Sequence, residues 1–176
     1  MQKYLALVLL AGCGEVPCFN SFYTAGMLVC YDHPSQQESE QVSAQVIEDL
    51  VQITEEETQV WFPEVKNLTD VLASHYVELT FTHALMGFNC SAYYGNTQIT
   101  QCERRIEGFN NNGTAIVVRY EDCKANYIIG HELLHSVEAF WLGGMTDHIT
   151  PDLWEKGKVM TQIKKRSDAL CAAEQE

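Results

Sequence analysis

The segment ANYIIGHELLHSVEAFWLGG, residues 125–144, restricts the fold more than any other part of the chain. Its isoleucine, leucine, valine and phenylalanine residues recur at helical spacing, and a Gly-Gly pair at its end supplies a helix stop. We therefore predict a helix that begins near residues 124–127 and ends at residues 143–144. Positions i and i+4 of a helix lie about 40° apart around the axis and about 6 Å apart along it. His131 and His135 should project from one face of this helix.

This spacing suits a metal ion. Two neutral imidazole nitrogens at i and i+4 can reach one ion, and zinc accepts imidazole in a tetrahedral shell that leaves a position for water. Glu132 lies about 100° further round the helix, close enough to bind such a water without being a ligand itself. The H-E-x-x-H pattern therefore predicts a Zn²⁺ site with His131 and His135 as ligands and Glu132 as general base.

A third ligand has to come from outside this pattern. His148 is the preferred candidate, because it follows the glycines that end the helix and a turn can bring it back to the metal. Asp147 would offer a harder oxygen donor at the neighbouring position. Glu138 is a further alternative, but it follows His135 by only three residues on the same rigid helix, where a supporting or surface role suits it better.

The remaining candidates have weaker patterns. His33, His75 and His83 have no partner at ligand spacing, so we expect ordinary surface or core histidines. Met160 is a candidate for an apolar floor beneath the metal, although a core position on a helix is the better expectation.

Residues 114–141, from the strand TAIVVRY through the helix, resemble the active-site strand and helix of the zincin metallopeptidases. The resemblance implies a small α+β zincin-like domain, in which a mostly antiparallel or mixed sheet packs on an N-terminal helix and on the H-E-x-x-H helix. It also implies hydrolysis of a peptide or protein substrate by zinc-bound water, assisted by Glu132. The chain departs from the metzincin pattern, which has glycine at position 138 and a ligand at position 141, where this chain has Glu138 and Trp141.

Two other functions fit the same residues. The first is a non-catalytic envelope lipoprotein in which zinc only stabilises the fold through a closed set of four protein ligands. The second is a zinc amidase that acts on a cell-wall crosslink. A water position on the metal separates the structural site from either enzyme.

The N-terminus MQKYLALVLLAGC has one lysine and a short apolar run, which is typical of an export signal and too short to span a bilayer. Residues 10–13, LAGC, resemble the lipobox of bacterial lipoproteins. This resemblance implies a signal peptide over residues 1–12 and a lipid on Cys13. It places the chain on a membrane of the bacterial cell envelope, at the periplasmic or extracellular face.

Six further cysteines accompany Cys13, which allows three disulfides and indicates an oxidising compartment. Separation in the sequence favours Cys18 with Cys30 and Cys90 with Cys102, and leaves Cys123 and Cys171.

At 176 residues the chain has the length of one domain, which we place at residues 35–176 after a tether and disulfide-bearing segment at residues 13–34. The net charge of −13 repels phosphate backbones and argues against nucleic acid as a partner.

Apolar periodicity predicts further helices at about residues 35–57, 63–74 and 152–173. Segments 76–85 and 114–120 are rich in β-formers and predict strands, either of which is a candidate edge for docking an extended peptide. Residues 87–113 predict mainly loop, with one optional short strand at 97–102 and a tight turn at NNNG.

Overall fold

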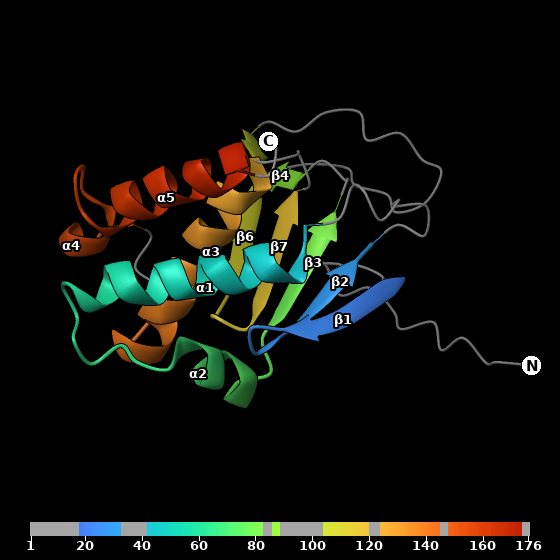
Figure 1. The fold of residues 1–176 in the computed structure, drawn as a ribbon, viewed down its shortest axis with the longest axis horizontal. Coiled ribbons are helices and arrows are strands. Elements are labelled where there is room, and N and C mark those ends of the chain that lie inside the picture. Colours follow the sequence, from blue (N-terminus) through green and yellow to red (C-terminus); the bar gives the residue numbers. More distant parts are fainter. Residues whose placement is uncertain are drawn as a thin grey trace, which may run out of the picture.

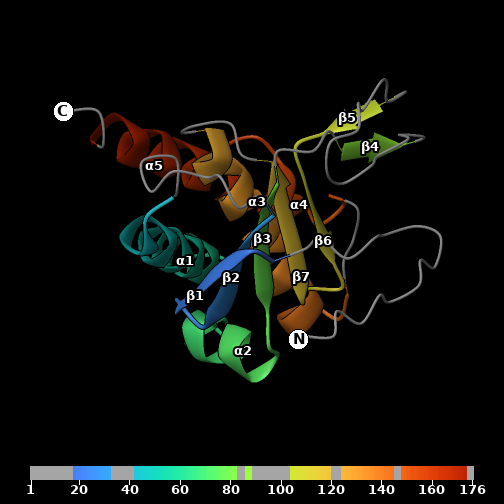
Figure 2. The ribbon, with the colours of Figure 1, turned by 90° about the vertical axis from the view of Figure 1, so that its right-hand side faces the viewer.

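The computed structural model describes residues 18–32, 42–82, 86–88, 104–119, 124–144 and 148–173. In this part of the chain a five-stranded mixed sheet forms one layer, helices α1 (Ala44–Gln59) and α3 (Lys124–Trp141) pack against it, and α5 (Val159–Ala173) packs on those two helices (Figures 1 and 2). The expectation of an α+β fold with a mixed sheet is confirmed. The strands of this sheet lie in the order β1 (Asn20–Thr24), β2 (Met27–Tyr31), β3 (Glu78–Thr82), β7 (Ala115–Arg119) and β6 (Gly108–Asn111).

The first two strands form a hairpin, β1 (Asn20–Thr24) and β2 (Met27–Tyr31). Ala25 and Gly26 both have left-handed backbones, φ 49° and 78°, which is the conformation of a two-residue hairpin turn. A side chain at Gly26 would collide with the carbonyl oxygen of Thr69. The tether predicted over residues 13–34 is therefore wrong for residues 18–32, which form part of the sheet.

The predicted Cys18–Cys30 disulfide is confirmed, and it closes the open end of this hairpin. Cys171 is also disulfide-bonded. The proposed pairing of Cys90 with Cys102, the lipidation site Cys13 and the whole signal peptide lie outside the described residues, so lipid anchoring stays a prediction. No helix in the ranges described above has the length and hydropathy needed to cross a bilayer.

The centre of the sheet is parallel, with β2, β3 (Glu78–Thr82) and β7 (Ala115–Arg119) side by side. Val29, Leu79 and Ile116 are in register across these strands and are fully buried. β3 and β7 are thus interior strands, and the expectation that one of them is an edge is wrong. Among the described strands the edges are β1 and β6 (Gly108–Asn111), which pairs antiparallel with β7.

β6 was not predicted, because its sequence GFNN contains glycine and two asparagines and resembles a loop. The predicted NNNG turn does join β6 to β7, with Asn112 and Gly113 in left-handed conformations, φ 53° and 83°. A second, two-stranded sheet pairs β4 (Met86–Phe88) with β5 (Arg104–Ile106). The optional strand at residues 97–102 lies outside the described residues.

Two predicted helices begin later than expected. α1 spans Ala44–Gln59, and its N-cap Ser43 accepts a hydrogen bond from the Val46 amide. α2 spans Leu68–Ser74, and the carboxylate of Glu55 accepts the amide hydrogens of Asn67 and Leu68 at 3.1 and 2.7 Å. The starts are set by these polar partners, one of which comes from another helix.

α3 spans Lys124–Trp141, as the sequence predicted. The predicted C-terminal helix is instead two, α4 (Pro151–Trp154) and α5 (Val159–Ala173), separated by a turn in which Gly157 has φ +85°. α3 and α5 approach closely, since a Cβ added at Gly130 would lie 2.5 Å from Ile163 Cγ2. The core between sheet and helices includes Ile47, Leu50, Phe81, Val118, Ile129, Leu133, Leu134 and Ile163.

Candidate metal centre

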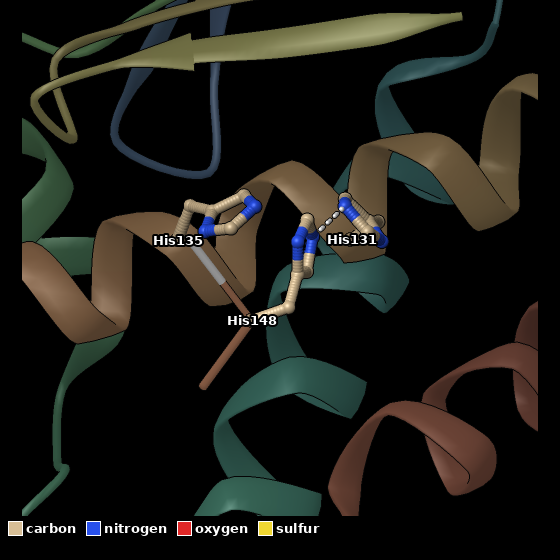
Figure 3. Close-up of side chains that lie close together, drawn as sticks. All are labelled: His131, His135 and His148. Atoms are coloured by element: carbon tan, nitrogen blue, oxygen red, sulfur yellow. Dashed lines mark hydrogen bonds between the residues drawn. The ribbon is translucent and has the colours of Figure 1, made fainter. Parts of the chain in front are cut away.

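Three histidines converge beside helix α3 (Figure 3). His131 and His135 project from α3 one turn apart, and His148 reaches them from the segment between α3 and α4. One ligand atom of each lies within 4.8 Å of the others, and the Nε2 atoms of His131 and His148 are 3.0 Å apart. The three side chains are therefore close enough to bind one metal ion.

His148 is brought back by the end of α3. The carbonyl oxygen of Glu138 accepts the amide hydrogens of Leu142 and Gly144, at 3.1 and 3.2 Å, and Gly143 has φ +83°. His148 itself has φ +68°, a left-handed conformation that side chains other than glycine adopt at a cost of about 1 kcal/mol or more. Surrounding contacts must hold such a residue in place.

Glu138 supports His135. Its side chain is fully buried, and its Oε2 lies 2.9 Å from Nδ1 of His135. A carboxylate only accepts hydrogen bonds, so Nδ1 carries the proton and Nε2 is left with a lone pair for a metal. This contact matches the supporting role considered for Glu138 and does not make it a member of the three-histidine group. Asp147, the other alternative, lies outside the described residues.

Trp154 is the residue at this centre that sequence reasoning missed. Its ring centroid lies 5.0, 4.7 and 4.4 Å from those of His131, His135 and His148, and its Nε1 donates to Glu138 Oε1 at 2.9 Å. Nothing in the spacing of the segment PDLW indicates this role. Met160, considered as an apolar floor, belongs to the core cluster instead.

Glu132 is buried beside the edge strand. A Cβ added at Gly108 of β6 would lie 2.8 Å from its Oε1, so glycine makes room for the carboxylate. Asn110 fastens the same strand to α3, because its amide donates to the Glu132 carbonyl oxygen at 2.7 Å and to Ser136 Oγ at 2.8 Å. The NNNG turn adds a bond from the Gly113 amide to Asn110 Oδ1, at 2.7 Å.

Burial changes the protonation of two residues at this centre. Desolvation raises the pKa of Glu132 from 4.5 to about 8. Desolvation, followed by the charges of His135 and His148, lowers the pKa of His131 from 6.5 to about 3. His131 is thus neutral at pH 7, which is the form that binds metals. A cation next to Glu132 would favour its ionised form.

The donor set fits a zinc ion. Three imidazoles supply nitrogen ligands, and one of them has its other ring nitrogen fixed by a carboxylate, as is usual for metal-binding histidines. Within the described ranges, no fourth histidine, cysteine or carboxylate joins the group. Three protein ligands leave a position for water, whereas structural zinc sites have four.

Other sequence candidates do not join this group. His75 is exposed and stacks on Phe140, with ring centroids 4.1 Å apart. His33 and His83 lie outside the described residues. No known protein family, curated protein or solved structure matches the chain.

Proposed function

We propose that this chain is a zinc metallopeptidase of the zincin type. The observation that carries the proposal is the convergence of three imidazoles, two of which, those of His131 and His135, come from the helix that also carries the buried Glu132. Acid–base catalysis needs a base held near the water that attacks the substrate, and Glu132, the residue after the first proposed ligand, would supply that base.

Each residue has a distinct task in this proposal. His131, His135 and His148 would hold Zn²⁺ through one ring nitrogen each. When bound, the ion would lower the pKa of a water molecule to about 7 and polarise the scissile carbonyl group. Glu132 would accept a proton from that water and later donate it to the leaving amine. Gly108 leaves the carboxylate the space that this exchange requires.

The substrate would be an extended peptide that adds to β6. This strand is at the edge of the described sheet, and its first residue, Gly108, lies against Glu132. A peptide paired with this edge by main-chain hydrogen bonds would run past the general base. The position of the edge therefore supports a peptide as substrate.

The decisive variant is Glu132→Gln. A glutamine keeps the size of the side chain and leaves all three imidazoles in place, so we expect stoichiometric zinc to remain bound. Activity on a mixed peptide library, followed by mass spectrometry, should fall by about 10²–10⁴-fold. Full activity of the variant would refute the mechanism.

The same two chains, tested also on isolated cell-wall crosslinks, separate the structural zinc site from the zinc amidase. Zinc binding without hydrolysis of any peptide or cell-wall crosslink, in wild type and variant alike, would indicate the structural site. Hydrolysis of isolated cell-wall crosslinks but not of peptides, again lost in Glu132→Gln, would indicate the amidase.

A further inference from the structure

We propose that Glu138 and Trp154 assemble the metal centre by joining the segment that carries His148 to helix α3. Glu138 and Trp154 are positioning residues that act through the histidines. The inference rests on the metal site of the proposed function, but it requires no peptidase activity.

A connection between the two segments is needed because the three histidines come from different parts of the chain. His131 and His135 are fixed relative to each other by one helix. His148 is separated from them by the turn after α3, is exposed, and has a left-handed backbone. Without further contacts its imidazole would sample many positions, and metal binding would carry the entropic cost of ordering it.

Glu138 binds both segments through one carboxylate. Oε2 contacts Nδ1 of His135 on α3, while Oε1 accepts hydrogen bonds from Thr150 Oγ1 at 3.0 Å and Trp154 Nε1 at 2.9 Å. The backbone carbonyl of the same residue ends α3 by accepting from Leu142 and Gly144. A buried carboxylate is costly unless donors surround it, and here three donors do so.

Trp154 links Glu138 to His148, the proposed third ligand. Its indole ring contacts the imidazoles of all three histidines, and the closest is His148, with centroids 4.4 Å apart. The hydrogen bond from Nε1 to Glu138 fixes the plane and depth of the ring. The ring in turn restricts the exposed imidazole of His148 to the side that faces His131.

The two parts of the connection can be separated by conservative variants. In Glu138→Gln the amide can accept from Thr150 and Trp154 through its oxygen, which turns its NH₂ group toward Nδ1 of His135. His135 would then accept at Nδ1 and carry its proton on Nε2, which removes that lone pair from the metal. Trp154→Phe keeps an aromatic ring but loses the donor to Glu138.

The test measures Zn²⁺ affinity of the whole chain by competition with a chelator. We expect Glu138→Gln to weaken binding by about 10–100-fold, the usual effect of losing a partner of a metal-binding histidine. Trp154→Phe should weaken it by about 3–10-fold, and the absorption bands of Co²⁺ in the site should shift, since the ligand geometry changes. Glu155→Gln, at an exposed neighbour of Trp154, is the matched control and should change affinity by less than about twofold.

Repeating the Trp154→Phe measurement in a chain that lacks His148 tests whether Trp154 acts through this histidine. If the tryptophan acts by holding the imidazole of His148, then Trp154→Phe should have little effect on Zn²⁺ affinity in a His148→Asp chain, which keeps a third metal-binding side chain but has no ring for the indole to contact. Equal weakening in both backgrounds would overturn the inference. Loss of folding stability in Glu138→Gln or Trp154→Phe with unchanged Zn²⁺ affinity and unchanged Co²⁺ bands would also overturn it, because that is the result of a purely structural role.

Failure of the inference and failure of the proposed function give different results. A chain that binds zinc with these dependences but hydrolyses nothing supports the inference and refutes the peptidase. A chain that hydrolyses peptides and binds Zn²⁺ equally tightly with and without Glu138→Gln does the reverse. A wild-type chain that binds no zinc refutes both.

Discussion

The ligands on α3 and the ligand after it are specified by different kinds of contact. His131 and His135 are held by the geometry of one helix, which packs on α5 so closely that Gly130 meets Ile163. His148 has an unfavourable left-handed backbone and is held by contacts such as that of its ring with Trp154. Local structure thus places two candidate ligands in advance, while the position of the third depends on a contact with Trp154, in the helix that follows α3.

Replacing His131 or His135, the two histidines on α3, should have the largest effect on zinc binding. Either His131→Ala or His135→Ala removes one of three ligands, and the two that remain cannot hold the ion against water. We expect no stoichiometric zinc by elemental analysis of the purified chain. His75→Ala, at an exposed histidine on α2's C-terminal side, is the control and should keep its zinc. Full zinc content in both ligand variants would eliminate the site.

The pH dependence of the metal-free chain should be the next largest effect. The pKa of Glu132 is raised from 4.5 to about 8 by burial, so the folded state keeps a proton that the unfolded state releases between these values. Its contribution to stability is complete below pH 4.5 and is lost as the pH rises to 8.

Glu132→Gln cannot ionise and should avoid this loss. Measured by denaturant unfolding in the presence of a chelator, the variant should gain on wild type by up to a few kcal/mol between pH 4.5 and 8. A stability difference that stays constant over this range would show that Glu132 is not buried as described.

A smaller effect is expected at Gly108. A methyl group there would lie 2.8 Å from Glu132 Oε1 and 2.6 Å from Ile128 Cγ2, so the carboxylate must move. Displacing a catalytic group by about 1 Å can cost up to 10²-fold, so if Glu132 is the proposed general base, Gly108→Ala should lower peptide hydrolysis by about 10–100-fold with zinc content unchanged. Loss of zinc together with activity would mean that the strand supports the ligands instead of the base.

The smallest effect should come from the turn that leads to His148. Gly143 has φ +83° and no atom within 4 Å of an added Cβ, so Gly143→Ala introduces backbone strain without a clash. We expect a loss of about 1 kcal/mol in unfolding free energy and a modest weakening of Zn²⁺ binding. Ala139→Gly, within α3, gives a comparable loss of stability from helix propensity and should leave zinc affinity nearly unchanged. Equal zinc affinities in the two variants would show that the turn at Gly143 does not position His148 for metal binding.

The elements that periodicity predicted well are those whose signal is local. α3 and the strands β3 and β7 appear where apolar spacing placed them, and the NNNG turn joins β6 to β7. The hairpin of residues 18–32 was mistaken for a tether and β6 for a loop, because glycine and asparagine obscure the alternation of a short strand. The sequence predicts one C-terminal helix in place of α4 and α5, because a single glycine such as Gly157 is a weak signal for a helix end.

The sequence alone determined the pair of histidines, the glutamate between them and the helix that displays them, because a period of 3.6 residues converts spacing directly into direction. It also favoured His148 as the third ligand, with Asp147 and Glu138 as alternatives. The tertiary structure decided that β6 lies against Glu132, that Glu138 faces His135 and the α4 segment, and that Trp154 contacts all three imidazoles. These contacts join segments that no repeat or spacing relates, and they arise only when the packing of α3, α4 and the sheet brings those segments together.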